Sequence, residues 1–308
     1  MGATASTKNT WLGIALTCAI ASQPQPASAD DATLSFAVLG DTPYFAWEAL
    51  RLEQVVDALN REDLAFVLHV GDIKSGRDRC DDSLYLDRLR LLQRSRHALV
   101  LLPGDNDWTD CHRSNNGGFD PLERLDHLRR TFHPDGFSLG SKPIRLERQS
   151  EDAKFAPFRE NMRWRTGPVL FAAVHVVGSG NNYSARPGAE YAARNRANLT
   201  WLAQAFELAA APDVQALVIA IHGNPLLESA LGSARRVGFD DFVRALEDRG
   251  QALGKPVLLI HGDTHRFRWD RPRPWLRRLE SFGSPGVDWV HVSVHPGAAE
   301  FFSVEPHQ

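Results

Sequence analysis

The feature that most constrains the fold is an apolar run that occurs three times and ends each time in Gly-Asp. The three runs are LSFAVLGD (34–41), AFVLHVGD (65–72) and ALVLLPGD (98–105). Short apolar runs of this kind are typical of strands that are buried on both faces. The stretches between them repeat apolar residues at the 3.6-residue spacing of a helix. The order therefore predicts β-α-β-α-β, the arrangement of a parallel sheet covered by helices.

The same alternation returns in the second half of the chain. We expect further strands at 169–177, 216–225, 255–265, 289–294 and 299–304. Helical spacing recurs around 199–206 and 239–246, whereas no helix separates the last two strands. Residues 141–166 are expected to form a hairpin or an insertion. Because no Pro/Ser-rich linker follows residue 30, the simplest organisation is one domain over residues 30–308.

The first 29 residues have the organisation of a secretory signal peptide. Lys8 provides a weakly basic start, the apolar run at 11–21 is too short to span a bilayer, and Ala-Ser-Ala at 27–29 fits a cleavage site. A disordered tail is the alternative, and the three features together favour the signal peptide. We therefore predict a secreted or periplasmic protein with no membrane span once the signal peptide is removed.

Removal of the signal peptide would leave two cysteines, Cys80 and Cys111. An even number of cysteines in an oxidising compartment predicts a disulfide bond. The loops that carry them leave adjacent parallel strands at the same edge of the sheet, so the two side chains can come within bridging distance. Two buried thiols are the alternative, and the Asp- and Arg-rich surroundings of both cysteines argue against burial.

Composition argues for a globular protein and against a nucleic-acid binder. Apolar residues make up 43% of the chain, charged residues make up 24%, and the net charge is −3. The segment 266–278 interleaves Arg with Phe and Trp, which is a pattern that can bind nucleic acid. Because no other segment is basic, we interpret it as a hairpin with an exposed basic loop. The sequence does not indicate an oligomeric state.

Five of the predicted strands end in an acidic residue or a histidine. These residues are Asp41, Asp72, Asp105, His222, Asp263 and His265. Ligands of open α/β sheets bind beyond the carboxyl ends of the strands, so side chains far apart in sequence converge there. Four carboxylates at one sheet edge would repel one another unless a cation neutralised them. The pattern therefore predicts a metal site.

The ordered set resembles the motifs of the calcineurin-like metallophosphoesterase superfamily. That family carries Asp-x-His, Gly-Asp, Gly-Asn-His-Asp/Glu, an isolated His and Gly-His-x-His, and the similarity runs from Asp41 to His265. The resemblance implies an α/β sandwich of central, mostly parallel sheets flanked by helices, two metal ions, and hydrolysis of phosphate esters. It implies one ion at Asp41, Asp72 and His265, and a second ion at Asp72, Asp105, His222 and Asp263.

Several positions depart from the family pattern. Pro43 stands where the family often has a metal-binding His, and Tyr44 is either a replacement ligand or, as we favour, a packed aromatic residue. Asp105 replaces a ligand Asn, although a register shifted by one would make Asn106 the ligand. Asp263 replaces the first His of the last motif. Such an oxygen-rich set favours Mn²⁺, Mg²⁺ or Fe²⁺/Fe³⁺ over Zn²⁺.

The candidate catalytic residues are Asn106 and His112. In the third motif Asn106 replaces the family's acid His, and an amide does not titrate near neutrality but can donate a hydrogen bond to a phosphoryl oxygen. His112 could supply the missing acid, and Arg113 could bind phosphate through two parallel hydrogen bonds. Asn181 and Asn182 are candidate substrate contacts, although they also suit a turn. His112 and Arg113 could equally be solvated loop residues.

Two hypotheses follow. The first is an exported, metal-dependent phosphoesterase that acts on small-molecule phosphate mono- or diesters. The second is a non-catalytic metal- or phosphoester-binding protein on a degenerate phosphoesterase scaffold. Asn106 favours the second hypothesis, whereas ligand-type residues at all five strand ends favour the first, which we adopt. The sequence does not name the substrate.

Overall fold

The computed structural model describes residues 1–3, 34–184 and 188–308, and the described residues from 34 onward form one compact unit. The features that predict a signal peptide, including the cleavage site at 27–29, lie outside the described residues. Among the helices that the structure describes, none is both long enough and apolar enough to cross a membrane.

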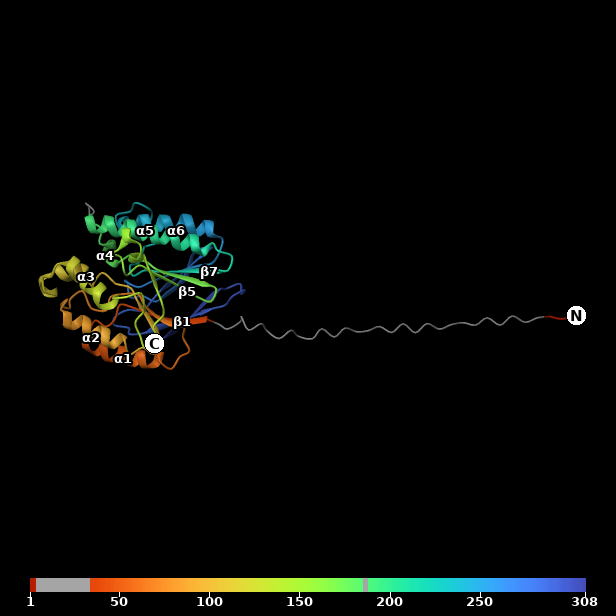
Figure 1. The fold of residues 1–308 in the computed structure, drawn as a ribbon, viewed down its shortest axis with the longest axis horizontal. Helices are drawn as coiled ribbons and strands as arrows, with labels where there is room; N and C mark the ends of the chain where they lie inside the picture. Colours follow the sequence, from red (N-terminus) through yellow and green to blue (C-terminus); the bar gives the residue numbers. More distant parts are fainter. Residues whose placement is uncertain (4–33, 185–187) are drawn as a thin grey trace. The chain divides into compact units, whose positions relative to one another are not determined.

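Two mixed sheets pack face to face in this unit (Figure 1). The first has the order β12-β11-β1-β2-β3, with β1 at Leu34–Leu39, β2 at Phe66–His69, β3 at Ala98–Leu101, β11 at Trp289–Val294 and β12 at Phe302–His307. The second has the order β4-β5-β6-β7-β8-β10-β9, with bounds Glu147–Arg148, Met162–Thr166, Val169–Ala173, Ala216–Ala220, Val257–His261, Arg268–Arg273 (β9) and Leu276–Glu280 (β10). The runs β1-β2-β3 and β6-β7-β8 are parallel, as predicted. Strand β10, whose pairing with β8 was not predicted, is parallel to β8, and the remaining pairs are antiparallel.

Helices cover the outer face of each sheet. The first sheet is covered by α1 (Ala46–Leu59), α2 (Asp82–Leu92) and α3 (Pro121–Phe132), and the second by α5 (Ala189–Ala209) and α6 (Asp240–Leu253). Figure 1 shows α5 and α6 on one side of the strands and α1 and α2 on the other. The short helices are α4 (Gly178–Asn181), η1 (Thr109–His112), η2 (Ser114–Asn116), η3 (Gln149–Glu151), η4 (Ala153–Phe155) and η5 (Val237–Phe239).

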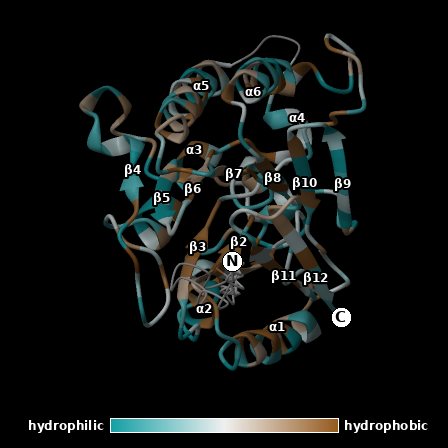
Figure 2. Ribbon diagram, turned by 90° about the vertical axis from the view of Figure 1, so that its right-hand side faces the viewer, coloured by the Kyte–Doolittle hydropathy of each residue, from teal (hydrophilic) through white to brown (hydrophobic). Residues whose placement is uncertain are grey.

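Alternation along the central strands explains why they are apolar throughout. In β1, Phe36 and Val38 face the second sheet, whereas Ala37 and Leu39 face the helices. The ring of Phe36 lies against Phe171 of β6 at 5.4 Å between centroids, so aromatic residues join the two sheets. Hydrophilic residues concentrate on edge strands such as β4 and β9 (Figure 2). Each central strand is thus held on both faces, which fixes where its carboxyl end emerges.

Three further segments can be compared with the expectations from the sequence. The interpretation of 266–278 as a hairpin is confirmed, because β9 and β10 pair there in antiparallel fashion. Helix α3 was not predicted, although its start carries a local signal: Pro121 is its first residue and the Asp120 carboxylate accepts a hydrogen bond from the Leu122 amide. Residues 141–166 contain the antiparallel pair β4–β5 together with η3 and η4.

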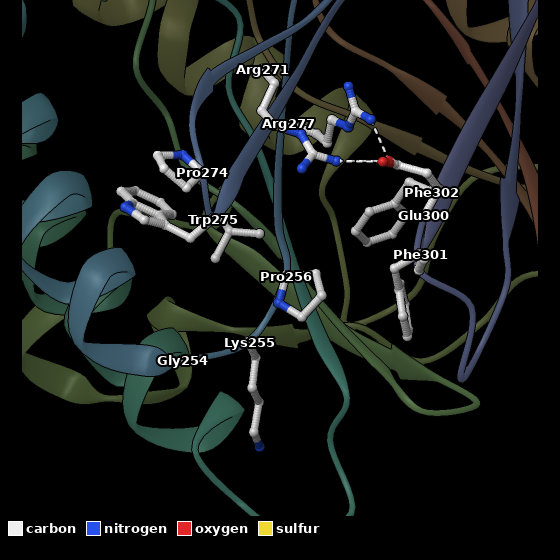
Figure 3. A pocket seen from close by; sticks show the side chains of 12 residues that line it. Gly254, Lys255, Pro256, Arg271, Pro274, Trp275, Arg277, Glu300, Phe301 and Phe302 are labelled. Carbon is white, nitrogen blue, oxygen red and sulfur yellow. Dashed lines mark hydrogen bonds and ion pairs between the residues drawn. The ribbon is translucent and has the colours of Figure 1, made fainter.

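A surface pocket of about 380 Å³ lies at the amino end of β8, beside the β9–β10 hairpin (Figure 3). Arg271 and Arg277 both donate hydrogen bonds to the Glu300 carboxylate at its rim. These pairs neutralise part of the basic loop. Because the predicted metal ligands follow the carboxyl ends of the strands, this pocket belongs to the opposite end of β8.

The predicted disulfide between Cys80 and Cys111 is confirmed, with Cα atoms 5.7 Å apart. The expectation that polar surroundings keep these cysteines exposed is wrong, because both are fully buried. They pack with Tyr85 and Leu128, so α2 and α3 cover the loops. The residues next to the cysteines in the sequence are polar, but the cysteines are buried partly by α3, which was not predicted.

Removing this disulfide should lower the free energy of unfolding by about 3–4 kcal/mol, because it closes a loop between residues 31 positions apart. The measurement is urea unfolding of wild type and of the Cys80→Ala/Cys111→Ala variant. Wild type under reducing conditions should unfold at the same midpoint as the variant. Equal midpoints for oxidised wild type and the variant would contradict the prediction.

Candidate metal centre

The six predicted ligands meet at one edge of the sandwich. Asp41, Asp72 and Asp105 follow the first three strands of the first sheet, and His222, Asp263 and His265 follow β7 and β8 of the second. Two triads of these residues bring their potential ligand atoms close together, and within each triad the three atoms lie within 4.8 Å of one another. The triads are Asp41/Asp72/His222 and Asp105/His222/Asp263. The centre therefore lies where the ends of both sheets meet.

The backbone turns sharply at four of these residues. Asp41, Asp72, Asp263 and His265 have φ values of 52°, 54°, 78° and 58°, in the left-handed region. Residues other than glycine rarely adopt this conformation and need surrounding structure to hold it. Part of that support comes from the centre itself, because the Asp263 amide donates to both carboxylate oxygens of Asp41 at 3.1 Å.

Two glycines allow the close approach of the loops. A Cβ atom on Gly104 would overlap the carboxylate of Asp72, and one on Gly178 would overlap those of Asp105 and Asp263. The Gly of the third Gly-Asp motif is therefore required by the carboxylate of the second.

Both histidines present the nitrogen that binds metals. The Nδ1 atom of His222 lies 2.8 Å from the Val70 carbonyl oxygen, and that of His265 lies 2.6 Å from the Ser284 carbonyl oxygen. Donation from Nδ1–H to these carbonyls leaves Nε2 as the free donor of a lone pair. Nε2 of His222 lies 3.0 Å from Asp105 Oδ1, and Nε2 of His265 lies 3.6 Å from Asp41 Oδ1.

The protein alone does not accommodate so many carboxylate charges. Burial raises the pKa of Asp41 to about 7, although the charges of both histidines lower it, and burial raises the pKa of Asp72 well above its usual range. Burial would also raise the pKa of Asp105, but the hydrogen bond and charge of His222 outweigh it, so that pKa is lowered. Burial would lower the pKa of His222, but Asp72 and Asp105 raise it well above its ordinary value. Bound cations would take over this role of countercharge.

The donor set fits metal ions and agrees in part with the grouping implied by the resemblance. Asp105, His222 and Asp263 form one triad, as expected for one ion. The other triad contains His222, whereas the resemblance implied His265. The carboxylate oxygens and imidazole nitrogens of this centre could hold metal ions, and the assignment of each residue stays a prediction.

Tyr44 contacts this centre, although we favoured a packed aromatic residue at this position from the sequence. Its hydroxyl donates to Asp72 Oδ2 at 2.7 Å, and its ring lies edge-on to His265 at 5.2 Å. The Asn106 amide nitrogen lies 2.5 Å from the same oxygen of Asp72 and 3.0 Å from the Tyr44 hydroxyl. The Tyr44 hydroxyl and the Asn106 amide therefore both lie beside the Asp72 carboxylate, where they can donate hydrogen bonds.

Asp107 organises the loops that carry the ligands. Its buried carboxylate accepts hydrogen bonds from the backbone amides of Gly104, Asp72 and Ile73, at 2.7, 3.0 and 2.8 Å. Buried Lys74 donates to the Asn106 carbonyl oxygen at 2.8 Å. These contacts join the second and third Gly-Asp loops into one unit.

Two of the candidate residues lie on the exposed surface of the third loop. His112 Nδ1 lies 2.9 Å from the Thr109 carbonyl oxygen, and Arg113 pairs with Asp110 at 2.6 Å. Within the described residues, no hydrogen bond or ion pair joins either side chain to the six predicted ligands. A role for His112 in proton transfer, or for Arg113 in phosphate binding, stays a prediction.

The two candidate asparagines sit in the loop after β6. Asn181 is buried, and its amide group contacts Val177, Arg194 and Gly238. Asn182 is exposed, and its amide nitrogen lies 2.9 Å from the Glu190 carboxylate. Because these hydrogen bonds connect Asn181 to other parts of the protein, Asn181 stabilises the loop. Substrate contact by Asn181 or Asn182 stays a prediction.

Sequence reasoning missed two contacts to the carboxylates. The Ser179 hydroxyl donates to Asp105 Oδ2 at 2.6 Å, and the Asn224 backbone amide donates to Asp263 Oδ2 at 2.9 Å. Ser179 lies two positions after the predicted strand that ends at residue 177, and Asn224 lies two positions after His222. Their position after a strand was the only indication in the sequence, and it does not show which polar residue of the turn contacts the carboxylates.

Solved structures share this fold, although the sequence alone matches little. No family model and no curated protein sequence matches the chain. A dimetal phosphatase from Danio rerio superposes with a TM-score of 0.60 at 12% identity, over 89% of this chain and 96% of that protein. A Staphylococcus aureus protein assigned to the 5′-nucleotidases superposes with a TM-score of 0.50 at 15% identity, over 90% of this chain. This chain spans 53% of the staphylococcal protein, about half its length.

The chain therefore has the fold of the calcineurin-like metallophosphoesterase superfamily, to which such proteins belong. The resemblance carried by the five strand-end motifs is confirmed at the level of the fold. At these identities the likeness says nothing further about the activity of this chain.

Replacing Asp72 should cost the protein more metal than replacing Asp41. Asp72 lies in the triad with Asp41 and His222, and the family resemblance implies that its carboxylate contacts both ions. Asp72→Ala should therefore remove both ions or nearly so. Asp41→Ala should spare more of the ion at Asp105, His222 and Asp263. The measurement is elemental analysis of the purified variants.

The matched control is Asp57→Ala, which removes an exposed carboxylate on α1 that pairs with Arg94. This variant should keep the metal content of wild type. Full occupancy by both ions in purified Asp72→Ala would refute the bridging assignment of Asp72.

Proposed function

We propose that this protein is a metal-dependent phosphoesterase that hydrolyses phosphate mono- or diesters at a binuclear centre. The observation that carries the proposal is the convergence of four carboxylates and two histidine Nε2 atoms from five strand ends. A fold shared with a dimetal phosphatase supports it. The substrate would be a small-molecule ester.

The ligand set favours hard ions. Oxygen-rich sites prefer Mn²⁺, Mg²⁺ or iron to Zn²⁺. When bound, such ions supply Lewis acidity, which acidifies water and stabilises negative charge on a phosphoryl group. Four carboxylates would balance two divalent ions and leave a centre near neutral, so Fe³⁺ at one position would make it more attractive to phosphate.

The chain's own residues supply hydrogen bonds but little acidity. Asn106 and Tyr44 can donate to a phosphoryl oxygen next to Asp72. Burial and the charge of Asp72 raise the pKa of the Tyr44 hydroxyl, so it retains its proton. Neither residue is a strong proton donor for a departing alkoxide, which makes leaving groups that need no proton the best substrates.

The second candidate is a non-catalytic protein that binds metal or a phosphoester on the same scaffold. The observation in its favour is Asn106, because the family's proton donor is absent at this position. Hydrolysis of an activated aryl phosphate with added Mn²⁺ distinguishes the two candidates, since a binding protein would not turn it over.

An exported location completes the proposal. The apolar run at 11–21 and the Ala-Ser-Ala at 27–29 form the pattern of a signal peptide. The disulfide between Cys80 and Cys111 supports an oxidising compartment, because such bonds persist in secreted and periplasmic proteins.

The rate of hydrolysis should depend steeply on the pKa of the leaving group. Loss of a general acid typically costs ~10²–10⁴ in rate, and the loss falls on poor leaving groups because a nitrophenolate departs without a proton. Asn106→His should flatten the dependence by restoring an acid beside Asp107. The measurement is kcat/KM across a series of aryl and alkyl phosphates.

His112→Ala is the companion variant in this experiment. If His112 donates the proton, wild type will show a shallow dependence and His112→Ala will steepen it. A shallow dependence in wild type and both variants would mean that another group donates the proton, and the proposed part of Asn106 would be withdrawn. No hydrolysis of any ester, with Mn²⁺ bound, would favour the binding protein.

A further inference from the structure

A run of left-handed residues follows β6 beside the metal centre. Ser179, Gly180, Asn181 and Asn182 have φ values of 50°, 65°, 58° and 51°. Three of the four are not glycine, and each such residue is strained in this conformation. Runs of this kind persist only where surrounding contacts impose them, and they occur preferentially at functional sites.

Arg194 of α5 holds this turn in place through hydrogen bonds. Its fully buried guanidinium donates to the Asn181 side-chain oxygen at 2.5 Å, to the Asn181 carbonyl at 3.0 Å and to the His175 carbonyl at 3.1 Å. Glu190 accepts from the same guanidinium at 2.6 Å, and Asn181 donates to the Gly238 carbonyl at 2.9 Å. The turn is therefore fixed at several points.

The turn delivers one hydroxyl to one carboxylate. The Ser179 hydroxyl donates to Oδ2 of Asp105 at 2.6 Å, while Oδ1 of Asp105 lies 3.0 Å from His222 Nε2. One oxygen of Asp105 thus faces the triad with His222 and Asp263, and the other is occupied by a hydrogen bond. Gly178, next to Ser179, has no side chain that would prevent this approach.

This hydrogen bond suits an Asp rather than an Asn at position 105. An amide offers one acceptor oxygen and carries its own donor, whereas a carboxylate has two equivalent acceptor oxygens. Without a donor on Oδ2, the Asp105 carboxylate is free to rotate or to bind through both oxygens. A hydrogen bond from a neighbouring residue is the usual means by which a ligating carboxylate is oriented.

We propose that Ser179 is a positioning residue that restricts Asp105 to one oxygen as a metal ligand, and that the Arg194-bound turn serves to present it. This inference rests on the metal binding in the proposed function. It adds a residue and a turn to which the strand-end pattern assigned no part.

Ser179→Gly separates this role from a purely structural one. Glycine adopts the left-handed conformation without strain, so the variant should melt at the wild-type temperature or above it. Affinity for one of two Mn²⁺ ions should nevertheless fall by roughly 10–100-fold, the usual cost of removing such a hydrogen bond. Ser179→Ala should show the same loss of affinity. Ser35→Ala, which removes an exposed hydroxyl that donates to the Asp63 carbonyl, should bind both ions as wild type does.

The measurement is titration of metal-depleted full-length protein with Mn²⁺, with free Mn²⁺ followed by electron paramagnetic resonance. Weakened binding of one ion in Ser179→Gly, with the melting temperature maintained, supports the inference. Unchanged affinity for both ions, or equal weakening of both, overturns it. Wild-type protein that binds no Mn²⁺ would overturn the metal centre itself, and is thereby distinguished from failure of Ser179 alone.

A second background tests why the hydroxyl is needed. In Asp105→Asn protein, adding Ser179→Gly should weaken Mn²⁺ binding by no more than roughly threefold, because the carboxylate oxygen that the hydroxyl serves is absent. Equal losses in the Asp105 and Asp105→Asn backgrounds would show that Ser179 does not act through Asp105.

Discussion

The burial of several carboxylates at one point is the constraint on which this structure depends. Asp41, Asp72, Asp105 and Asp263 converge at one edge of the sandwich with most of their surface removed from water. Burial raises the pKa of Asp41, Asp72 and Asp263, which means that their charged forms are unfavourable without a partner. His222 alone cannot balance four such groups. The arrangement is consistent with a protein whose folded state is completed by cations.

The centre also joins the two sheets. Asp41, Asp72 and Asp105 come from the first sheet, and hydrogen bonds from the second reach them across the seam. The Asp263 amide donates to Asp41, and the ring of His222 contacts both Asp105 and the Val70 carbonyl. Because these contacts connect strands on different sheets, any change in the packing of the sandwich alters the spacing of the ligands.

The central strands and the meeting of the six candidate ligands at one edge could be predicted from the sequence because their signals are local and repeated. Each strand is an apolar run ending in a ligand-type residue, and parallel strands bring their carboxyl ends to one edge. The part played by Ser179 could not be predicted, because it depends on Arg194, which lies fifteen positions further along the chain. The contact of Tyr44 with the metal centre was not expected for a similar reason, since only the folded loops bring its hydroxyl to Asp72.

The most direct test of the binuclear centre is a crystal structure of the protein grown with Mn²⁺, with an anomalous difference map. We expect two peaks: one beside Asp41 and His265, and one beside Asp105, His222 and Asp263, with Asp72 between them. A single peak would contradict the binuclear centre. No peak at this edge of the sandwich would contradict metal binding by these residues altogether.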